Sequence, residues 1–362
     1  MTIPSFPSEI ILLILEAGYF NHKFRPDRYF LNNCSQISRI WAAQAQPLLF
    51  RHVEVRRPSS LAALKDALTI PNHRRPALQG VVLWLRIWIG FSESASTPAA
   101  LPSLLAICPN LYGLSVTFRH MSKLPEELPM LPPNIFALEC CDWEKNYGFE
   151  VARHLIRSGW HSLRILILRG HIPLQGIPPN LAELRVDAFS VYFNAIGWSS
   201  TVPRSQVNLR ILDTTRFRGF VPFTGLLGVC NHSLESFRTT WIDPEDLKDC
   251  GRLRELVLET FFDRRCFMGL QMLPLEHLAY VLSPVHCEED YAREYISSSR
   301  TLRVVSCLTP IHPWDQRITI YMDDLAQICV RTKVRLDCYT TIRSFREFTV
   351  RRRSTYCLRT LT

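Results

Sequence analysis

The sequence predicts an α/β protein in which a small helical N-terminal unit precedes an irregular, curved solenoid of repeats with a parallel sheet. Three observations predict this fold. An apolar run from Ile10 to Leu15 follows a helix-start signal at Pro7. A short pattern of spaced leucines then recurs along most of the chain. Finally, 47% of the 362 residues are hydrophobic and 21% are charged, so the chain can build a sizeable core and does not resemble a disordered one.

The first predicted helix begins at Pro7, because proline suits the first turn and Glu9 there faces the positive end of the helix dipole. Helical spacing puts four apolar residues on one stripe, namely Ile10, Leu13, Ile14 and Ala17. Three others point elsewhere, namely Ile11, Leu12 and Leu15. A helix that is apolar all round must be buried all round. A unit of about fifty residues cannot achieve this alone, so we expect a second protein to cover the remaining face.

A second helix is predicted from Leu31 to Trp41, and the segment 45–51 closes the unit. The ordered pattern is Pro-x-Glu-Ile, then Leu-x-x-Cys-Ser-x-Ile-Ser-x-x-Trp, then Gln-Pro-Leu-Leu-Phe. This pattern resembles an F-box of the fungal type, and the resemblance covers only the first fifty or so residues. It departs from the usual pattern at Phe6, where leucine is commoner, and between Gly18 and Phe30, where the segment is longer and more basic.

The F-box resemblance implies docking onto a Skp-family adaptor and, through it, onto a cullin in a ubiquitin ligase. The residues that would bind the adaptor are Pro7, Glu9, Ile10, Leu13, Ile14, Leu31, Cys34, Ile37 and Trp41. The alternative is an ordinary amphipathic helix pair that caps a larger domain. Motif matches of this kind are hypotheses, so both interpretations are carried forward.

Internal repeats organise the rest of the chain. Three segments share a Pro-Asn-apolar motif, in 108–114, 131–138 and 177–184, and full Leu-x-x-Leu-x-Leu copies start at Leu163 and Leu253. Weaker copies start at Phe50, Val82, Leu209, Leu234, Leu275 and Leu302, and a last copy is suggested at Val334 and Leu336. The eleven anchors from Phe50 to Leu302 are about 25 residues apart on average, a period within the range of leucine-rich repeats. The chain after the F-box therefore resembles leucine-rich-repeat proteins.

Each copy is expected to form a short strand whose alternate residues enter a common core. The second anchors Leu166, Leu184 and Leu256 should then be buried. Steps of 18 to 32 residues make the repeats irregular, with a helical return at 59–68 and none in the proline-rich stretch 124–133. The predicted domains are an F-box over 1–50, a solenoid over 51–340 and a basic tail over 341–362. The alternative is a plain α/β domain whose leucines recur at this spacing by chance.

Residues that flank the second anchors should face away from the core, on the surface that solenoids use for binding. From this alternation we predict a substrate-binding set of Ile165, Ile167, Glu183, Arg185, Asp187, Asp213, Glu255 and Glu259. Because acidic residues recur in this set, we expect a protein segment of basic and apolar character. In the alternative, this face is only solvated and ligands bind the loops or the arginine-rich tail.

The sequence contains no motif of a nucleotide-binding loop, a serine hydrolase or a zinc protease, so we expect no enzyme activity and no cofactor. The 12 cysteines include no Cys-x-x-Cys pair, and Cys108, Cys230 and Cys250 lie three or four residues before anchors, which is a packing position. The cluster 286–290 contains His, Cys, Glu and Asp, but no second ligand pair is near it in sequence. We therefore expect an acidic loop there and no metal.

Charge and hydropathy limit the partners. The formal net charge is +9, but only Arg351–Arg353 forms a basic run, so nucleic acid is not the expected partner. No stretch is long enough to cross a bilayer and the N-terminus lacks a signal-peptide pattern, so we expect no membrane and a cytoplasmic or nuclear location. The predicted function is substrate recognition in a Skp–cullin–F-box ubiquitin ligase. The alternative is a leucine-rich-repeat scaffold without a ubiquitin role.

Overall fold

The computed structural model describes residues 6–19, 27–69, 80–90, 100–142, 144, 147–170, 172, 176–187, 207–214, 224–240, 244–259, 270–282, 291–309, 316–342 and 344–345. The chain divides into two compact units. The first comprises Met1–Leu163 with Arg169–Ile172, and the second comprises Arg164–Leu168 with Pro173–Thr362.

Three helices form the start of the first unit: α1 (Ser8–Ala17), α2 (Arg28–Ser35) and α3 (Arg39–Arg51). The Asp27 side chain caps α2 by accepting a hydrogen bond from Phe30 N at 2.9 Å. Ser38 caps α3 by accepting one from Trp41 N at 3.4 Å. The single helix predicted from Leu31 to Trp41 is therefore wrong, because Ser38 starts a new helix inside that segment.

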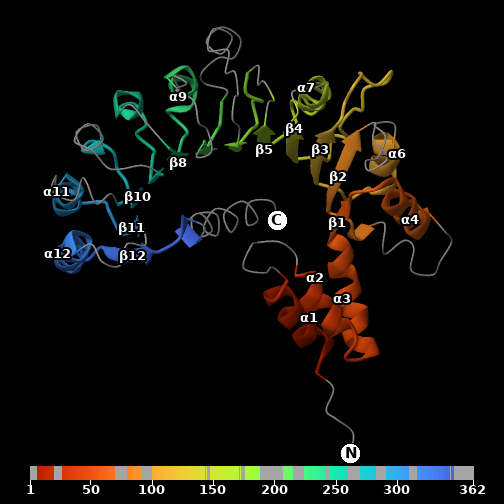
Figure 1. The fold of residues 1–362 in the computed structure, drawn as a ribbon, viewed down its shortest axis with the longest axis horizontal. Helices are drawn as coiled ribbons and strands as arrows, with labels where there is room; N and C mark the ends of the chain where they lie inside the picture. Colours follow the sequence, from red (N-terminus) through yellow and green to blue (C-terminus); the bar gives the residue numbers. More distant parts are fainter. Residues whose placement is uncertain are drawn as a thin grey trace, which may run out of the picture. The chain divides into compact units, whose positions relative to one another are not determined.

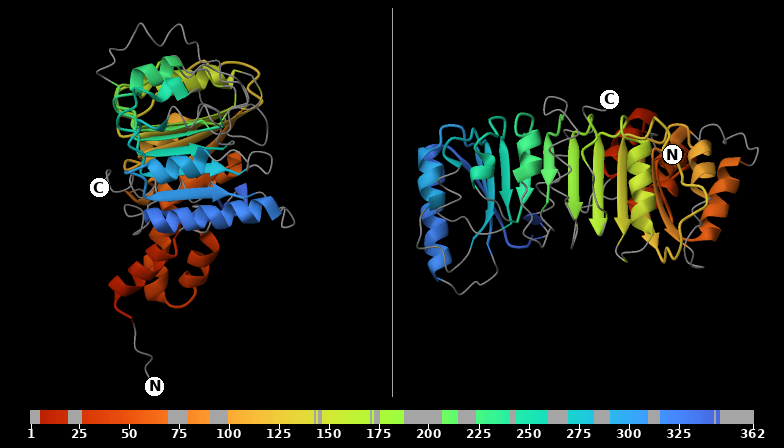
Figure 2. Two further views of the ribbon diagram at one scale, coloured as in Figure 1. Left: turned by 90° about the vertical axis from the view of Figure 1, so that its left-hand side faces the viewer. Right: turned by 90° about the horizontal axis from the view of Figure 1, so that it is seen from above.

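The described residues form twelve strands, which follow the order of the sequence in one sheet, and every pairing with a described register is parallel. Within each unit, the arrows in Figure 2 lie side by side and point the same way. Their bounds are β1 His52–Val55, β2 Trp84–Gly90, β3 Gly113–Arg119, β4 Ala137–Asp142, β5 Ile165–Gly170, β6 Glu183–Asp187, β7 Ile211–Asp213, β8 Ser236–Thr239, β9 Glu255–Leu258, β10 His277–Val281, β11 Val304–Leu308 and β12 Arg335–Tyr339. The predicted α/β class with a parallel sheet is confirmed.

The segments between strands return on one side of the sheet. In the first unit they include α4 (Pro58–Thr69), α6 (Ala100–Ile107) and α7 (Gly148–Ser158). In the second unit they include α9 (Thr224–Cys230), the 3-10 helix η2 (Pro244–Leu247), α11 (Tyr291–Ser298) and α12 (Gln316–Thr332). Within each unit, Figure 1 shows the return helices on one side of the strands, namely α4, α6 and α7 in the first unit and α9, α11 and α12 in the second. We call the side opposite to these helices the open face.

The predicted anchors coincide with the strands. Leu166, Leu184 and Leu256 are each 0% exposed, as their place in the pattern requires. In the second unit one row of paired residues runs across seven strands, from Leu184 through Leu212, Phe237, Leu256, Leu278 and Val305 to Leu336. The suggested last copy at Val334 and Leu336 is therefore a strand of the sheet, β12. A slip of one residue would move this whole row to the open face, so apolar burial fixes the register.

The Pro-Asn-apolar motif has a structural role that its sequence did not reveal. The Asn134 side-chain amide donates to the carbonyl oxygens of Pro109 and Leu111, each at 2.9 Å. Asn110, one repeat earlier, donates to the carbonyl oxygen of Gly80 at 2.9 Å. The asparagine that precedes the first anchor therefore ties its repeat to backbone oxygens of the preceding repeat.

A C-terminal aromatic residue covers part of the open face of the second unit. Phe345 is 0% exposed and packs in a cluster with Val257, Ala279 and Leu308. Its ring lies edge-on to that of Tyr339, with 5.8 Å between the centroids. Residue 345, which lies within the segment 341–362 predicted as a basic tail, therefore packs against strands of the second unit. Alternation alone placed Val257 and Ala279 on the open face but could not show that they are covered.

Candidate functional site

Helix α1 presents an apolar stripe that the molecule leaves uncovered. Ile10, Leu13 and Ile14 are 41%, 62% and 39% exposed, whereas Ile11 and Leu15 lie in the core of the first three helices. This is the division that helical spacing predicted. We call Ile10, Leu13 and Ile14 the α1 stripe. Isolated exposed apolar side chains are ordinary on protein surfaces, but a contiguous patch marks an interaction site.

The other residues predicted to bind the adaptor fall into two groups. Pro7, Glu9 and Ile37 are exposed and Trp41 is half-buried, so these four are accessible from solvent. Leu31 and Cys34 are 0% and 6% exposed and lie inside the core, so their placement on the docking surface is corrected. The spacing that put these two on one face was right. That face, however, packs against the neighbouring helices and supports the surface from within.

The three helices are joined to the first strand by polar contacts. The Tyr19 hydroxyl hydrogen-bonds to His52 Nδ1, and the Arg28 guanidinium donates to the His52 carbonyl oxygen at 3.2 Å. Burial, followed by the nearby guanidinium of Arg51, lowers the pKa of His52 to about 4, so its ring is neutral at pH 7. Its Nδ1 atom can therefore accept the hydrogen bond from the Tyr19 hydroxyl. Burial raises the pKa of Tyr19, which keeps its hydroxyl protonated as the donor.

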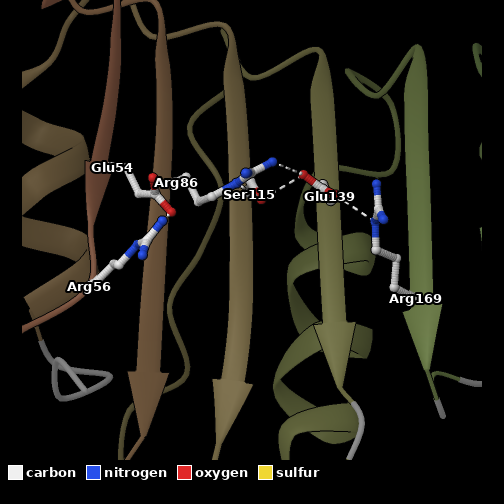
Figure 3. A network of polar contacts seen from close by, with 6 residues as sticks. All are labelled: Glu54, Arg56, Arg86, Ser115, Glu139 and Arg169. Atoms are coloured by element: carbon white, nitrogen blue, oxygen red, sulfur yellow. Dashed lines mark hydrogen bonds and ion pairs between the residues drawn. The ribbon is translucent and has the colours of Figure 1, made fainter. Parts of the chain in front are cut away.

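On the open face of the first unit, one carboxylate is shared by two arginines (Figure 3). Glu139 is 5% exposed and accepts hydrogen bonds from Ser115 Oγ at 2.7 Å and from Arg86 at 3.1 Å. It also forms an ion pair with Arg169, whose Nε lies 2.7 Å from Glu139 Oε1. Burial alone would raise its pKa, but the two guanidinium groups and Ser115 hold it below its usual range. Glu139 is therefore ionised at neutral pH. Its single negative charge faces the two positive charges of Arg86 and Arg169.

Two further arginines lie over a tryptophan of the same face. The guanidinium carbons of Arg119 and Arg56 lie 3.9 Å and 5.4 Å from the ring centroid of Trp88. Arg56 also pairs with Glu54, at 2.9 Å. The sequence prediction missed this group because the alternation rule was not applied to the weak copies at Phe50 and Val82. Applied there, it places Arg86 and Trp88 on the open face.

In the second unit the predicted acidic residues are largely neutralised. Glu259 forms an ion pair with Arg238 at 2.5 Å, and both side chains are nearly inaccessible, at 3% and 2% exposed. The side chain of Glu183 is 2% exposed and pairs with Arg185. The placement of Glu183 and Glu259 on an accessible acidic surface is therefore corrected. The other six residues of the predicted set are partly exposed: Ile165, Ile167, Arg185, Asp187, Asp213 and Glu255.

A chain of polar groups crosses four strands of the second unit. Ser236 Oγ donates to Glu255 Oε1 at 2.7 Å, Glu255 Oε2 lies 3.1 Å from His277 Nδ1, and His277 Nε2 lies 2.9 Å from Ser306 Oγ. An acid, an imidazole and a hydroxyl in this order also occur in serine hydrolases. A nucleophile must be exposed beside an oxyanion site, whereas Ser306 is 0% exposed in the middle of β11. This chain of hydrogen bonds is therefore suited to holding β8, β9, β10 and β11 together.

The three cysteines that precede repeat anchors are buried, as expected for packing residues. Cys108, Cys230 and Cys250 are 1%, 0% and 0% exposed. Burial raises the pKa of all three, to about 11 for Cys108 and about 12 for Cys250, which disfavours the reactive thiolate.

Metal ligands and membrane spans were sought in the same part of the chain. The described residues hold no group of three or more His, Cys, Asp and Glu side chains placed to bind a metal. The sequence cluster 286–290 lies outside the described residues. No described helix combines the length and the apolar character that crossing a bilayer requires.

Asp142 is a buried carboxyl group whose ionisation makes the stability of the fold depend on pH. It is 0% exposed, burial raises its pKa to about 6, and its Oδ2 atom has no hydrogen-bond partner among the described residues. The unfolded group ionises near pH 4 and the folded group only near pH 6. Stability therefore falls as the pH rises from about 4 to about 6, and the penalty is constant above that range.

Replacing Asp142 by asparagine removes this penalty. We expect Asp142→Asn to raise the free energy of unfolding by about 1–3 kcal/mol at pH 7 and to leave it unchanged near pH 3.5. Urea denaturation at both pH values measures the effect, with Asp66→Asn on the exposed side of α4 as the control. An equal change at both pH values would contradict this account of Asp142.

Comparison with known proteins gives no family assignment. No family model matches this chain, and no curated sequence is similar to it. The function of this chain is therefore inferred from the chemistry of its surfaces, namely the α1 stripe and the open face of each unit.

Proposed function

We propose that this protein is the substrate-recognition subunit of a Skp–cullin–F-box ubiquitin ligase. The observation that carries the proposal is the α1 stripe, an exposed apolar surface on a helix whose opposite side is buried in a small helical core. A surface of this kind is stabilised when a partner covers it. The α1 stripe lies within the ordered N-terminal pattern that resembles an F-box. This resemblance indicates that the partner is a Skp-family adaptor.

The proposal divides the work between two parts of the chain. The N-terminal helices bind the adaptor, and through it a cullin, while the open face of the repeats binds a protein substrate. The recruited enzymes carry out the chemistry, and this chain contributes geometry by raising the effective concentration of substrate near activated ubiquitin. The protein acts without a cofactor in this scheme, in the cytoplasm or the nucleus.

The second candidate is a repeat scaffold without a ubiquitin role, whose N-terminal helices only cap the sheet. The contacts of Tyr19 and Arg28 with His52 favour it, because they join the helices to β1 as a cap would be joined. A helix that serves only as a cap has its apolar side chains turned inward, however. The exposure of Ile10, Leu13 and Ile14 favours a docking helix instead.

Co-expression of the full chain with a Skp-family adaptor tests the choice. We expect the two proteins to co-purify and to elute together in size-exclusion chromatography as a complex of one copy each. If the full chain is folded and elutes separately from the adaptor at micromolar concentration, the scaffold interpretation replaces the ligase interpretation.

A further inference from the structure

The open face of the first unit carries more positive than negative charge. Among the described residues of this face, Arg56, Arg86, Arg119 and Arg169 stand against two carboxylates, those of Glu54 and Glu139. We call these four arginines, together with Trp88, the arginine–tryptophan surface. A basic surface with unmatched charge attracts acidic partners and concentrates them near it.

Arg119 is the residue of this surface best prepared to bind an anion. No carboxylate pairs with it in the described part of the chain, and its guanidinium stacks over Trp88 at 3.9 Å from the ring centroid. Stacking fixes the plane of the guanidinium and leaves its N–H groups at the edge free to donate. A carboxylate accepts two such bonds side by side, so little ordering is needed when it binds.

A neighbouring hollow extends the basic surface beyond the strands. It has a volume of about 360 Å³ and is lined by Arg28, Glu54, Arg56, Arg57 and Ser60. Arg57 is exposed, and it too has no carboxylate partner in the described part of the chain. Glu54, the one acidic residue of the lining, pairs with Arg56. The hollow therefore adds two arginines to the surface without adding a carboxylate beyond those already counted.

The second unit provides an internal comparison, because its open-face arginines are matched by acids. Arg238 pairs with Glu259 and Arg185 with Glu183, and each of these glutamates is nearly inaccessible. Pairing of this kind consumes the donors of the guanidinium and cancels its charge. The first unit differs because Arg86 and Arg169 share one glutamate and Arg119 has no carboxylate partner among the residues that the structure describes.

We infer that the arginine–tryptophan surface binds an extended protein segment rich in aspartate and glutamate. This inference rests on the proposed function and names the chemistry of the substrate. Neighbouring strands are about 4.8 Å apart, so Arg119 on β3 and Arg169 on β5 are roughly 10 Å apart across the sheet. An extended segment of the polyproline II type rises about 3.1 Å per residue with three residues per turn, so acidic residues three positions apart lie on one side and match this separation.

The same observations favour a protein segment over single-stranded nucleic acid. Binding of that kind uses exposed aromatic rings on which successive bases stack. Here Arg119 and Arg56 lie over the Trp88 ring, and Trp84 packs against His52 and Tyr112 with centroids 6.3 Å and 6.0 Å apart. The surface therefore offers charge and hydrogen-bond donors, while its tryptophan rings are engaged within the protein.

The test is fluorescence anisotropy with the full chain, measured both alone and with the adaptor present. The probe is a labelled peptide of about twelve residues with glutamate at every third position, and its glutamine counterpart is the neutral control. We expect the acidic peptide to bind, Arg119→Gln to weaken it about tenfold or more, and added salt to weaken it further. Arg57→Gln, at an exposed side chain, should also weaken binding, and it does so without disturbing the fold.

The control variant is Arg335→Gln, which removes an exposed arginine of β12 and should leave peptide affinity unchanged. Equal affinity of the parent chain and of both the Arg119 and Arg57 variants would overturn the inference. Tighter binding of a single-stranded RNA oligonucleotide, lost in the same two variants, would overturn it in favour of nucleic acid. Binding of the adaptor is measured on the same protein. If the acidic peptide binds and the adaptor does not, the proposed function is contradicted and the inference about this surface stands.

Discussion

A chain carrying both Ile10→Asp and Leu13→Asp is expected to lose the Skp-family adaptor while remaining folded. Both side chains are exposed on α1, at 41% and 62%, so aspartate is tolerated in the free protein. In the complex, each carboxylate would be buried against an apolar partner surface without a counter-charge, which costs several kcal/mol. We therefore expect affinity to fall by at least about 100-fold, measured by isothermal titration calorimetry.

The control for this experiment is Ile320→Asp, which places the same charge at an apolar side chain of α12 that is 62% exposed. It should bind the adaptor as the parent chain does. Circular dichroism and thermal unfolding establish that each variant is folded. A folded double variant that still co-purifies with the adaptor would remove the main support for the F-box interpretation.

The second large effect is expected at the buried ion pair of Arg238 and Glu259. Glu259→Gln removes the carboxylate that forms a buried ion pair with the guanidinium of Arg238, and Arg238 is 1% exposed. Breaking a buried pair by removing one member costs about 3–5 kcal/mol. We expect a loss of this size in the free energy of unfolding, measured by urea denaturation.

Replacing both members of the pair separates the charge effect from a packing effect. The double variant Arg238→Leu with Glu259→Leu should recover most of the lost stability, because no unpaired charge is then buried. Two outcomes would contradict this description of the pair. Either Glu259→Gln is as stable as the parent chain, or the double variant is less stable than Glu259→Gln.

Local patterns in the sequence predicted the strands and the α1 stripe correctly. The position of Ile10, Leu13 and Ile14 on one side of a helix follows from helical spacing alone, and the structure leaves that side exposed. The second anchors also follow from local spacing, since a period of two fixes which residues enter the core. The burial of Leu31 and Cys34 could not be predicted in the same way, because it depends on how α2 packs against its neighbours.

The charge pattern of the open face was harder to predict, because it depends on which residues of different repeats become neighbours. Glu259 is neutralised by Arg238, which is 21 positions earlier, and Glu139 is shared by Arg86 and Arg169. Repeats of unequal length hide these pairs until the strand register is known. Phe345 was missed for a related reason, because it follows the last anchor and no repeat pattern places it.

Amide hydrogen exchange of the full chain, alone and in complex with a purified Skp-family adaptor, tests the central claim most directly. The account predicts slower exchange in the complex across residues 8–17, where the adaptor covers the α1 stripe, and unchanged exchange in the strands of the sheet. Absence of a complex, or slowed exchange confined to the strands while residues 8–17 are unaffected, would contradict it.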